Sequence, residues 1–109
     1  MGMDLYIYRA RNHEIFKHDN WYESPNVTEV FYARKYWAIP EHCSFIPSDY
    51  ESGDFIQLTE DDLKDMIKVA CEHRDYFDTY NNVPKLCELR DKFDEIEEEG
   101  DHLFLEYDW

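Results

Sequence analysis

The stretch Asp54-Phe55-Ile56-Gln57-Leu58-Thr59-Glu60-Asp61-Asp62-Leu63 joins the two patterns that decide the fold. Its first five positions are mostly aromatic or aliphatic, which is typical of a strand. Thr59 and Asp62 then have the spacing of a capping box, and carboxylates fill the first helical turn, where the helix dipole favours them. The sequence therefore predicts a strand at 54–58 that leads directly into a helix over 59–74.

A second helix is predicted over residues 84–98. Pro84 suits its first turn, and Gly100 suits its end. Apolar residues recur between them at intervals of three and four, the period of a helix with one buried stripe: Leu86, Leu89, Phe93 and Ile96. We expect this stripe to face the core and the remaining, largely acidic, faces to meet solvent.

The rest of the chain predicts shorter elements. Alternating aliphatic and tyrosine residues indicate a strand at 4–10, and a similar run indicates one at 102–107. Thr28 followed by Glu29 is typical of a helix start, which predicts a helix over 28–38, and Pro40 then allows a short helical turn at 40–45. Residues 11–27 and 47–53 are rich in turn formers and predict loops. We expect three aromatic residues to hold the first loop to the body: Phe16, Trp21 and Tyr22.

These elements predict an α+β fold in a single domain that spans residues 1–109. The order contains no internal repeat, and helices alternate with strands that are too few for a large sheet. We expect a small three-stranded, mostly antiparallel sheet with helices packed on one face. A chain of 109 residues with 43% hydrophobic residues is large enough for one such core.

The net charge of −15 is divided unevenly along the chain. Residues 1–48 contain six acidic and five basic residues, whereas residues 49–109 contain 20 acidic and six basic ones. A surface of this sign repels nucleic acid and anionic membranes and attracts basic partners. The composition therefore argues against direct binding to nucleic acid or membrane and favours a basic protein surface as the partner.

The same residues indicate a cytoplasmic location. No secretory leader is visible at the start, and no run approaches the roughly 18 apolar residues of a membrane span. Three cysteines form an odd and sparse set, which suits reduced thiols better than a disulfide framework.

The acidic residues are the candidate binding site. Four-residue steps along the second helix advance roughly 6 Å, which is similar to the separation of successive phosphates in a nucleic-acid strand. The alternative is a solvated face that keeps the protein soluble. The partner-binding residues that we predict form two clusters: Asp49, Glu51, Asp61, Asp62 and Asp65, then Glu88, Asp91, Asp94, Glu95 and Glu98.

No pattern of catalytic residues is present. The chain has only three glycines and no phosphate-binding loop, Gly-x-Ser-x-Gly or His-Glu-x-x-His sequence. We therefore expect a protein that is not an enzyme and needs no cofactor. Cys71 and His73 have the spacing of a pair of metal ligands, so a small metal-dependent hydrolase is an alternative, although core or surface roles suit these residues better. A virion or assembly protein that uses exposed aromatic residues is another.

Two segments resemble small phage- and prophage-encoded proteins of unknown function. They are Met1-Gly2-Met3-Asp4-Leu5-Tyr6-Ile7-Tyr8 and Glu29-Val30-Phe31-Tyr32-Ala33-Arg34-Lys35. Such proteins often have Trp where this chain has Ala33, and the resemblance implies no catalytic residue. It implies a phage-encoded inhibitor in the host cytoplasm, with a host nuclease as target, as for anti-CRISPR proteins and other DNA mimics. Arg34, Lys35 and the nearby aromatic residues allow a small polar pocket or, alternatively, ordinary core packing.

Overall fold

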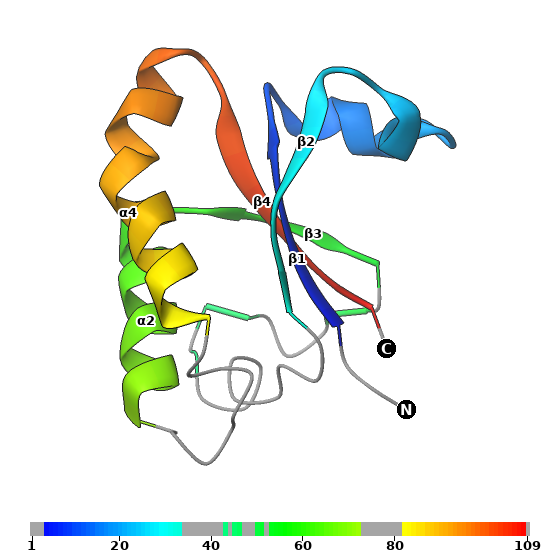
Figure 1. Ribbon diagram of the computed structural model, residues 1–109. Coiled ribbons are helices and arrows are strands. Elements are labelled where there is room, and N and C mark those ends of the chain that lie inside the picture. Colours follow the sequence, from blue (N-terminus) through cyan, green and yellow to red (C-terminus); the bar gives the residue numbers. More distant parts are fainter. Residues whose placement is uncertain are drawn as a thin grey trace.

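The computed structural model describes residues 4–33, 43, 45–46, 50–51, 53–72 and 82–108. In these ranges the protein is α+β, with an antiparallel sheet and two α-helices (Figure 1). The elements in chain order are β1 (Asp4–Ala10), the 3₁₀ helices η1 (His13–Lys17) and η2 (Trp21–Glu23), β2 (Val27–Ala33), β3 (Phe55–Leu58), α2 (Glu60–Glu72), α4 (Val83–Glu98) and β4 (His102–Asp108).

The sheet has the strand order β2-β1-β4-β3, and every pairing is antiparallel. The predicted antiparallel sheet is confirmed, but the described residues contain four strands, so the prediction of three was wrong. The two central strands come from opposite ends of the chain, because Asp4 pairs with Asp108 and Ala10 with His102.

The extra strand is β2, at residues where the sequence predicted the start of a helix. The prediction of a helix over 28–38 is wrong for residues 28–33, and residues 34–38 lie outside the described part. β-Branched and aromatic residues make up most of Val27–Ala33, and these favour an extended chain. The edge of β1 that does not pair with β4 supplies backbone hydrogen-bond partners for this segment. These outweigh the weak helix cap that Thr28 and Glu29 would provide.

A bulge in β2 determines which face of the sheet each of its side chains points to. Ile7 pairs with Phe31 but Tyr8 pairs with Glu29, so Val30 is the extra residue. Val30 then packs against the same core as Phe31, whereas Glu29 lies beside Tyr8. This irregular alternation is one reason why the segment does not have the plain period of a strand.

The other predicted elements agree with the structure. The strands at 4–10, 54–58 and 102–107 correspond to β1, β3 and β4, and the helix over 84–98 corresponds to α4. The helix over 59–74 is confirmed as far as Glu72, and its last two residues lie outside the described ranges. Most of the predicted turn at 40–45 lies outside them as well.

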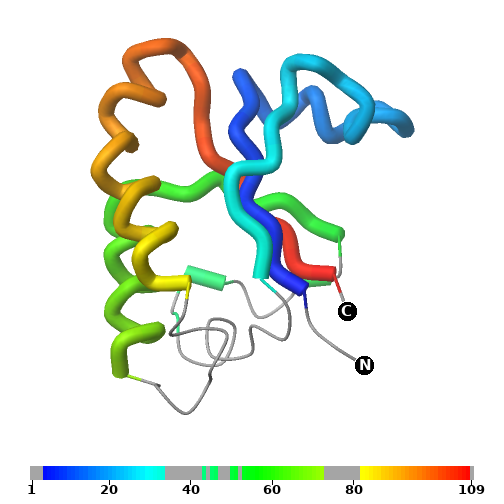
Figure 2. The backbone as a smooth tube through the Cα atoms, in the orientation of Figure 1, coloured from blue at the N-terminus to red at the C-terminus, as the bar shows by residue number. Residues whose placement is uncertain are grey.

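The two α-helices lie side by side and cover one face of the sheet, as Figure 2 also shows. Leu5, Ile7 and Leu105 point to this face from the central strands and are fully buried. The predicted stripe of α4 packs on them: Leu86, Leu89, Phe93 and Ile96. Helices on one face of the sheet are therefore confirmed.

The opposite face has its own, smaller core. Phe104 points to this face from β4 and packs with Phe16 of η1, whose ring stacks on Phe55 with centroids 4.0 Å apart. Trp21 of η2 packs against the same cluster. The predicted anchoring by Phe16 and Trp21 is confirmed, but Tyr22 is 67% exposed and does not contribute.

The start of α2 and the end of α4 have specific caps. The Asp62 amide donates to Thr59 Oγ1 at 3.2 Å, and the Thr59 amide donates to Asp62 Oδ2 at 2.9 Å, which completes the predicted capping box. At the end of α4, Gly100 has φ +85°, and the Asp101 amide donates to the Ile96 carbonyl at 3.1 Å. This is a Schellman cap, in which glycine avoids the strain of a left-handed conformation.

The capping box makes a prediction about stability. Thr59→Ala removes the hydroxyl acceptor of the Asp62 amide and should lower the free energy of unfolding by about 1 kcal/mol. Thr59→Ser keeps that acceptor and should retain most of this stability. Urea unfolding of the two variants measures the difference. A loss in Thr59→Ser as large as that in Thr59→Ala would contradict the capping role.

Candidate functional site

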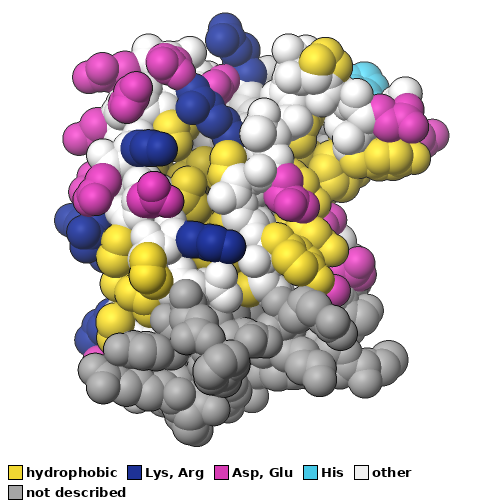
Figure 3. Space-filling model, viewed as in Figure 1, with side chains coloured by type: hydrophobic (Ala, Val, Ile, Leu, Met, Phe, Trp, Pro, Cys, Tyr) yellow, Lys and Arg dark blue, Asp and Glu magenta, His cyan; other side chains and the backbone are white. Residues whose placement is uncertain are grey.

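The predicted carboxylates of α4 form one exposed ridge. Because the apolar stripe faces the sheet, the intervening positions point outward. We define the acidic ridge as Glu88, Asp91, Asp94, Glu95 and Glu98, all of which are exposed. Figure 3 shows acidic side chains gathered over the outer surface of the helical layer. The structure therefore places the second predicted cluster on one surface.

Most of this ridge is without nearby positive charge. Arg90 reaches Asp91 at 3.4 Å. The other four carboxylates have no ion pair with any described lysine or arginine. Lys85 and Lys92 lie on the flank of α4 beside Glu88, and these three residues line one hollow of about 560 Å³ that faces β2. Glu88 therefore has basic neighbours, whereas Asp94, Glu95 and Glu98 form the part of the ridge without a charged partner among the described lysines and arginines.

The ridge continues to the C-terminal end of α4, where negative charge is unfavourable for the helix. The negative end of the helix dipole is at the C-terminus, where acidic side chains are unfavourable. Glu95 and Glu98 nevertheless lie in the last turn, which contains no basic residue. Arg9 and Arg11 lie just beyond this helix end and offset part of its negative charge. They pair with Asp101 at 2.8 and 3.9 Å, and Arg9 also pairs with Glu99, the cap residue of α4.

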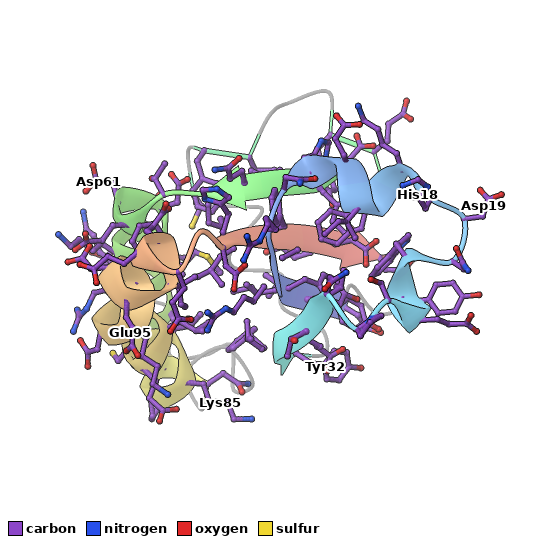
Figure 4. The ribbon with its side chains drawn as sticks, turned by 90° about the horizontal axis from the view of Figure 1, so that it is seen from above. His18, Asp19, Tyr32, Asp61, Lys85 and Glu95 are labelled. Atoms are coloured by element: carbon purple, nitrogen blue, oxygen red, sulfur yellow. The ribbon has the colours of Figure 1, made fainter. Side chains whose placement is uncertain are left out.

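The first predicted cluster does not form one surface. Asp61 is exposed at the start of α2, and Figure 4 shows it at the helical end of the molecule, as it does Glu95. Asp62 belongs to the capping box. Asp65 lies beside Cys43, and Glu51 is exposed in the loop before β3. Asp49 lies outside the described residues.

Among the described cysteines, Cys43 is a core residue. Its side chain is 6% exposed, and burial, together with the nearby Asp65, raises the pKa of the thiol to about 12. Such a thiol is neutral at physiological pH and a poor ligand or nucleophile. Cys71 is exposed, but its predicted companion His73 is outside the described part. Within that part, no three His, Cys, Asp or Glu side chains are placed to share a metal ion.

A second acidic site lies on the sheet, and the predicted binding residues do not include it. Glu106 of β4 pairs with Tyr6 of β1, and Glu29 pairs with Tyr8. Their side chains share the face opposite the α-helices. Tyr6 and Tyr8 alternate with aliphatic residues, which indicates that both rings lie on one face of the strand. Glu29 was not expected beside them, because residues 28–38 were predicted to form a helix. No sequence pattern gives the partner of Glu106.

This second site differs electrostatically from the ridge. Burial, followed by the charge of Asp108, raises the pKa of Glu106 to about 7. Burial and then the charges of Glu106 and Glu29 also raise the pKa of Tyr8. A carboxylate that is partly withdrawn from water and surrounded by rings is a more specific feature than a solvated acidic face.

Comparison with known proteins assigns no family. No protein-family model, curated protein or solved structure matches this chain. The resemblance to phage-encoded proteins therefore stays a prediction. In the ranges that the structure covers, no helix is both long and apolar enough to cross a membrane.

The position of the ridge predicts that removing charge from it stabilises the protein. The double variant Glu95→Gln, Glu98→Gln should gain roughly 0.5–2 kcal/mol at low ionic strength, because two carboxylates leave the negative end of α4. Glu88→Gln, in the first half of the helix, is the control for the change in net charge. Urea unfolding would contradict the dipole argument if the double variant gained no more than twice the control.

Proposed function

We propose that this protein is a non-enzymatic binding protein whose acidic ridge occupies a basic surface on another protein. The observation that carries the proposal is the exposed row of five carboxylates on α4, of which only Asp91 forms an ion pair with a described lysine or arginine. The row continues to the C-terminal end of the helix, where negative charge is unfavourable. Natural proteins keep such unfavourable groups chiefly where function requires them.

The partner's surface is proposed to be one that otherwise binds nucleic acid. A rigid row of carboxylates on a helix presents negative charge at intervals comparable with those of a phosphate backbone. Lysine and arginine side chains arranged for phosphates would find partners along it. The protein would then act as a DNA mimic and inhibit the partner by competition.

The alternative is that the ridge only increases solubility. Solubility requires net charge but no particular position for it. The uneven distribution of charge along the chain, together with the exposure of all five ridge carboxylates on one helix, favours a directional role. Direction matters because complementary charge steers a partner to one face and raises the association rate.

The test is capture of partners from a cell extract, followed by binding measurements with the purified partner. Wild-type binding should weaken steeply with salt and should be displaced by duplex DNA. Glu95→Gln, Glu98→Gln should weaken binding by roughly tenfold or more, as expected when two charge-assisted contacts are lost.

A matched control removes the same charge elsewhere. Asp19→Asn, Glu23→Gln lies in and beside η2, on the other side of the sheet from α4, and changes the net charge equally. This variant should bind the partner as the wild type does. Equal weakening in both double variants, or binding that DNA and salt leave unchanged, would refute the proposal.

A further inference from the structure

One part of the sheet combines tyrosine rings with carboxylates. It lies opposite the face that α2 and α4 cover, beside the small core that η1 and η2 form. We define the tyrosine face as Tyr6, Tyr8, Glu29 and Glu106, with Trp21 at its border. Strand pairing puts Glu106 of β4 next to Tyr6 and Glu29 of β2 next to Tyr8, so the two rings lie in the middle with one carboxylate on each side of β1.

The rings of this face are mutually supported. Tyr6 and Tyr8 are nearly parallel, with centroids 5.8 Å apart and an interplanar angle of 11°. Tyr6 also contacts Tyr32 at 4.9 Å, and Trp21 meets Tyr8 edge-on at 5.0 Å. Neighbouring rings restrict each other's rotamers, so this surface is ordered in advance of any ligand.

The carboxylates of this face have no cationic partner among the described residues. In the part of the chain that the structure covers, neither Glu106 nor Glu29 forms an ion pair, and the described strand side chains on this face include no lysine or arginine. Lys17 of the neighbouring η1 is paired with Glu14 at 2.9 Å. A partly buried, unpaired carboxylate beside aromatic rings attracts a cation strongly because water screens it less.

We propose that the tyrosine face binds the guanidinium group of an arginine side chain on a partner protein. A guanidinium group is planar, stacks on aromatic rings and donates two parallel hydrogen bonds to a carboxylate. Tyr6 and Tyr8 supply the rings, and Glu106 and Glu29 supply acceptors on either side of them. A lysine ammonium group would use the charge but not the planar surface.

This site is independent of the acidic ridge. The ridge projects from α4, which packs on the face that contains Leu5 and Ile7, whereas Tyr6 and Tyr8 point to the other face. The inference rests on rings, the half-buried Glu106 and the exposed Glu29, and does not require the proposed function of the ridge.

Arginine binding should depend on pH near neutrality. Glu106 is faced by Tyr6 and Tyr8 from β1, by Tyr50 from the loop before β3 and by Asp108 of its own strand. The pKa of Glu106 is raised to about 7, and the raised pKa values of the three tyrosines keep them neutral there. Binding should therefore strengthen from about pH 6 to about pH 8, as the carboxylate loses its proton.

The experiment is a titration of the protein with N-acetyl-arginine amide, followed by the NMR resonances of the Tyr6 and Tyr8 rings. The neutral isostere N-acetyl-citrulline amide is the control ligand. We expect saturable shifts with the arginine compound only, and roughly tenfold weaker binding in Glu106→Gln, because a charge-assisted hydrogen bond is lost. Glu29→Gln, at an exposed position where misfolding is not a concern, should weaken binding several-fold.

The outcomes separate this site from the ridge. Glu95→Gln, Glu98→Gln should bind the arginine compound as tightly as the wild type does. Loss of binding in that variant would place the ligand on the ridge and overturn the inference. Equal shifts with citrulline, or unchanged affinity in both Glu106→Gln and Glu29→Gln, would overturn it as well.

Discussion

Burial of β4 on both of its faces is the constraint on which the rest of the structure depends. Leu103, Phe104 and Leu105 are consecutive and have no exposed surface, although neighbouring side chains of a strand point in opposite directions. Each face therefore needs a cover. The amphipathic α2 and α4 provide one, and the aromatic segment with η1 and η2 provides the other, smaller one.

The two covers differ in extent, and the two candidate binding surfaces follow from that difference. α4 buries one stripe fully, so its carboxylates are left on the far side as a ridge. Phe16 and Trp21 cover only part of the opposite face, which leaves Tyr6 and Glu106 beyond their reach, half-buried and accessible. The ridge suits long-range attraction, because its charges are solvated and four of the five form no ion pair with a described lysine or arginine. The tyrosine face suits close contact, because its rings and carboxylates are fixed by strand pairing.

Elements whose pattern lies within one short segment could be predicted from the sequence. The capping box of Thr59 and Asp62 and the stripe of α4 depend on neighbours within one helix, so their positions and the exposed ridge could be predicted. β2 depends instead on pairing with β1, and a bulge at Val30 disturbs its alternation, so its segment was interpreted as a helix. The tyrosine face requires Glu106 to meet Tyr6 from the other end of the chain, a contact that no local pattern contains.

Burial of the sheet on both faces can be measured as the loss of stability when the smaller cover is truncated. Phe16→Ala should cost about 3–5 kcal/mol in urea unfolding, because Phe16 is buried against Phe55 and Phe104. Tyr22→Ala, an aromatic truncation in the same segment at a side chain that is 67% exposed, should cost no more than about 0.5 kcal/mol. A loss in Phe16→Ala as small as that in Tyr22→Ala would contradict a sheet that is buried on both faces.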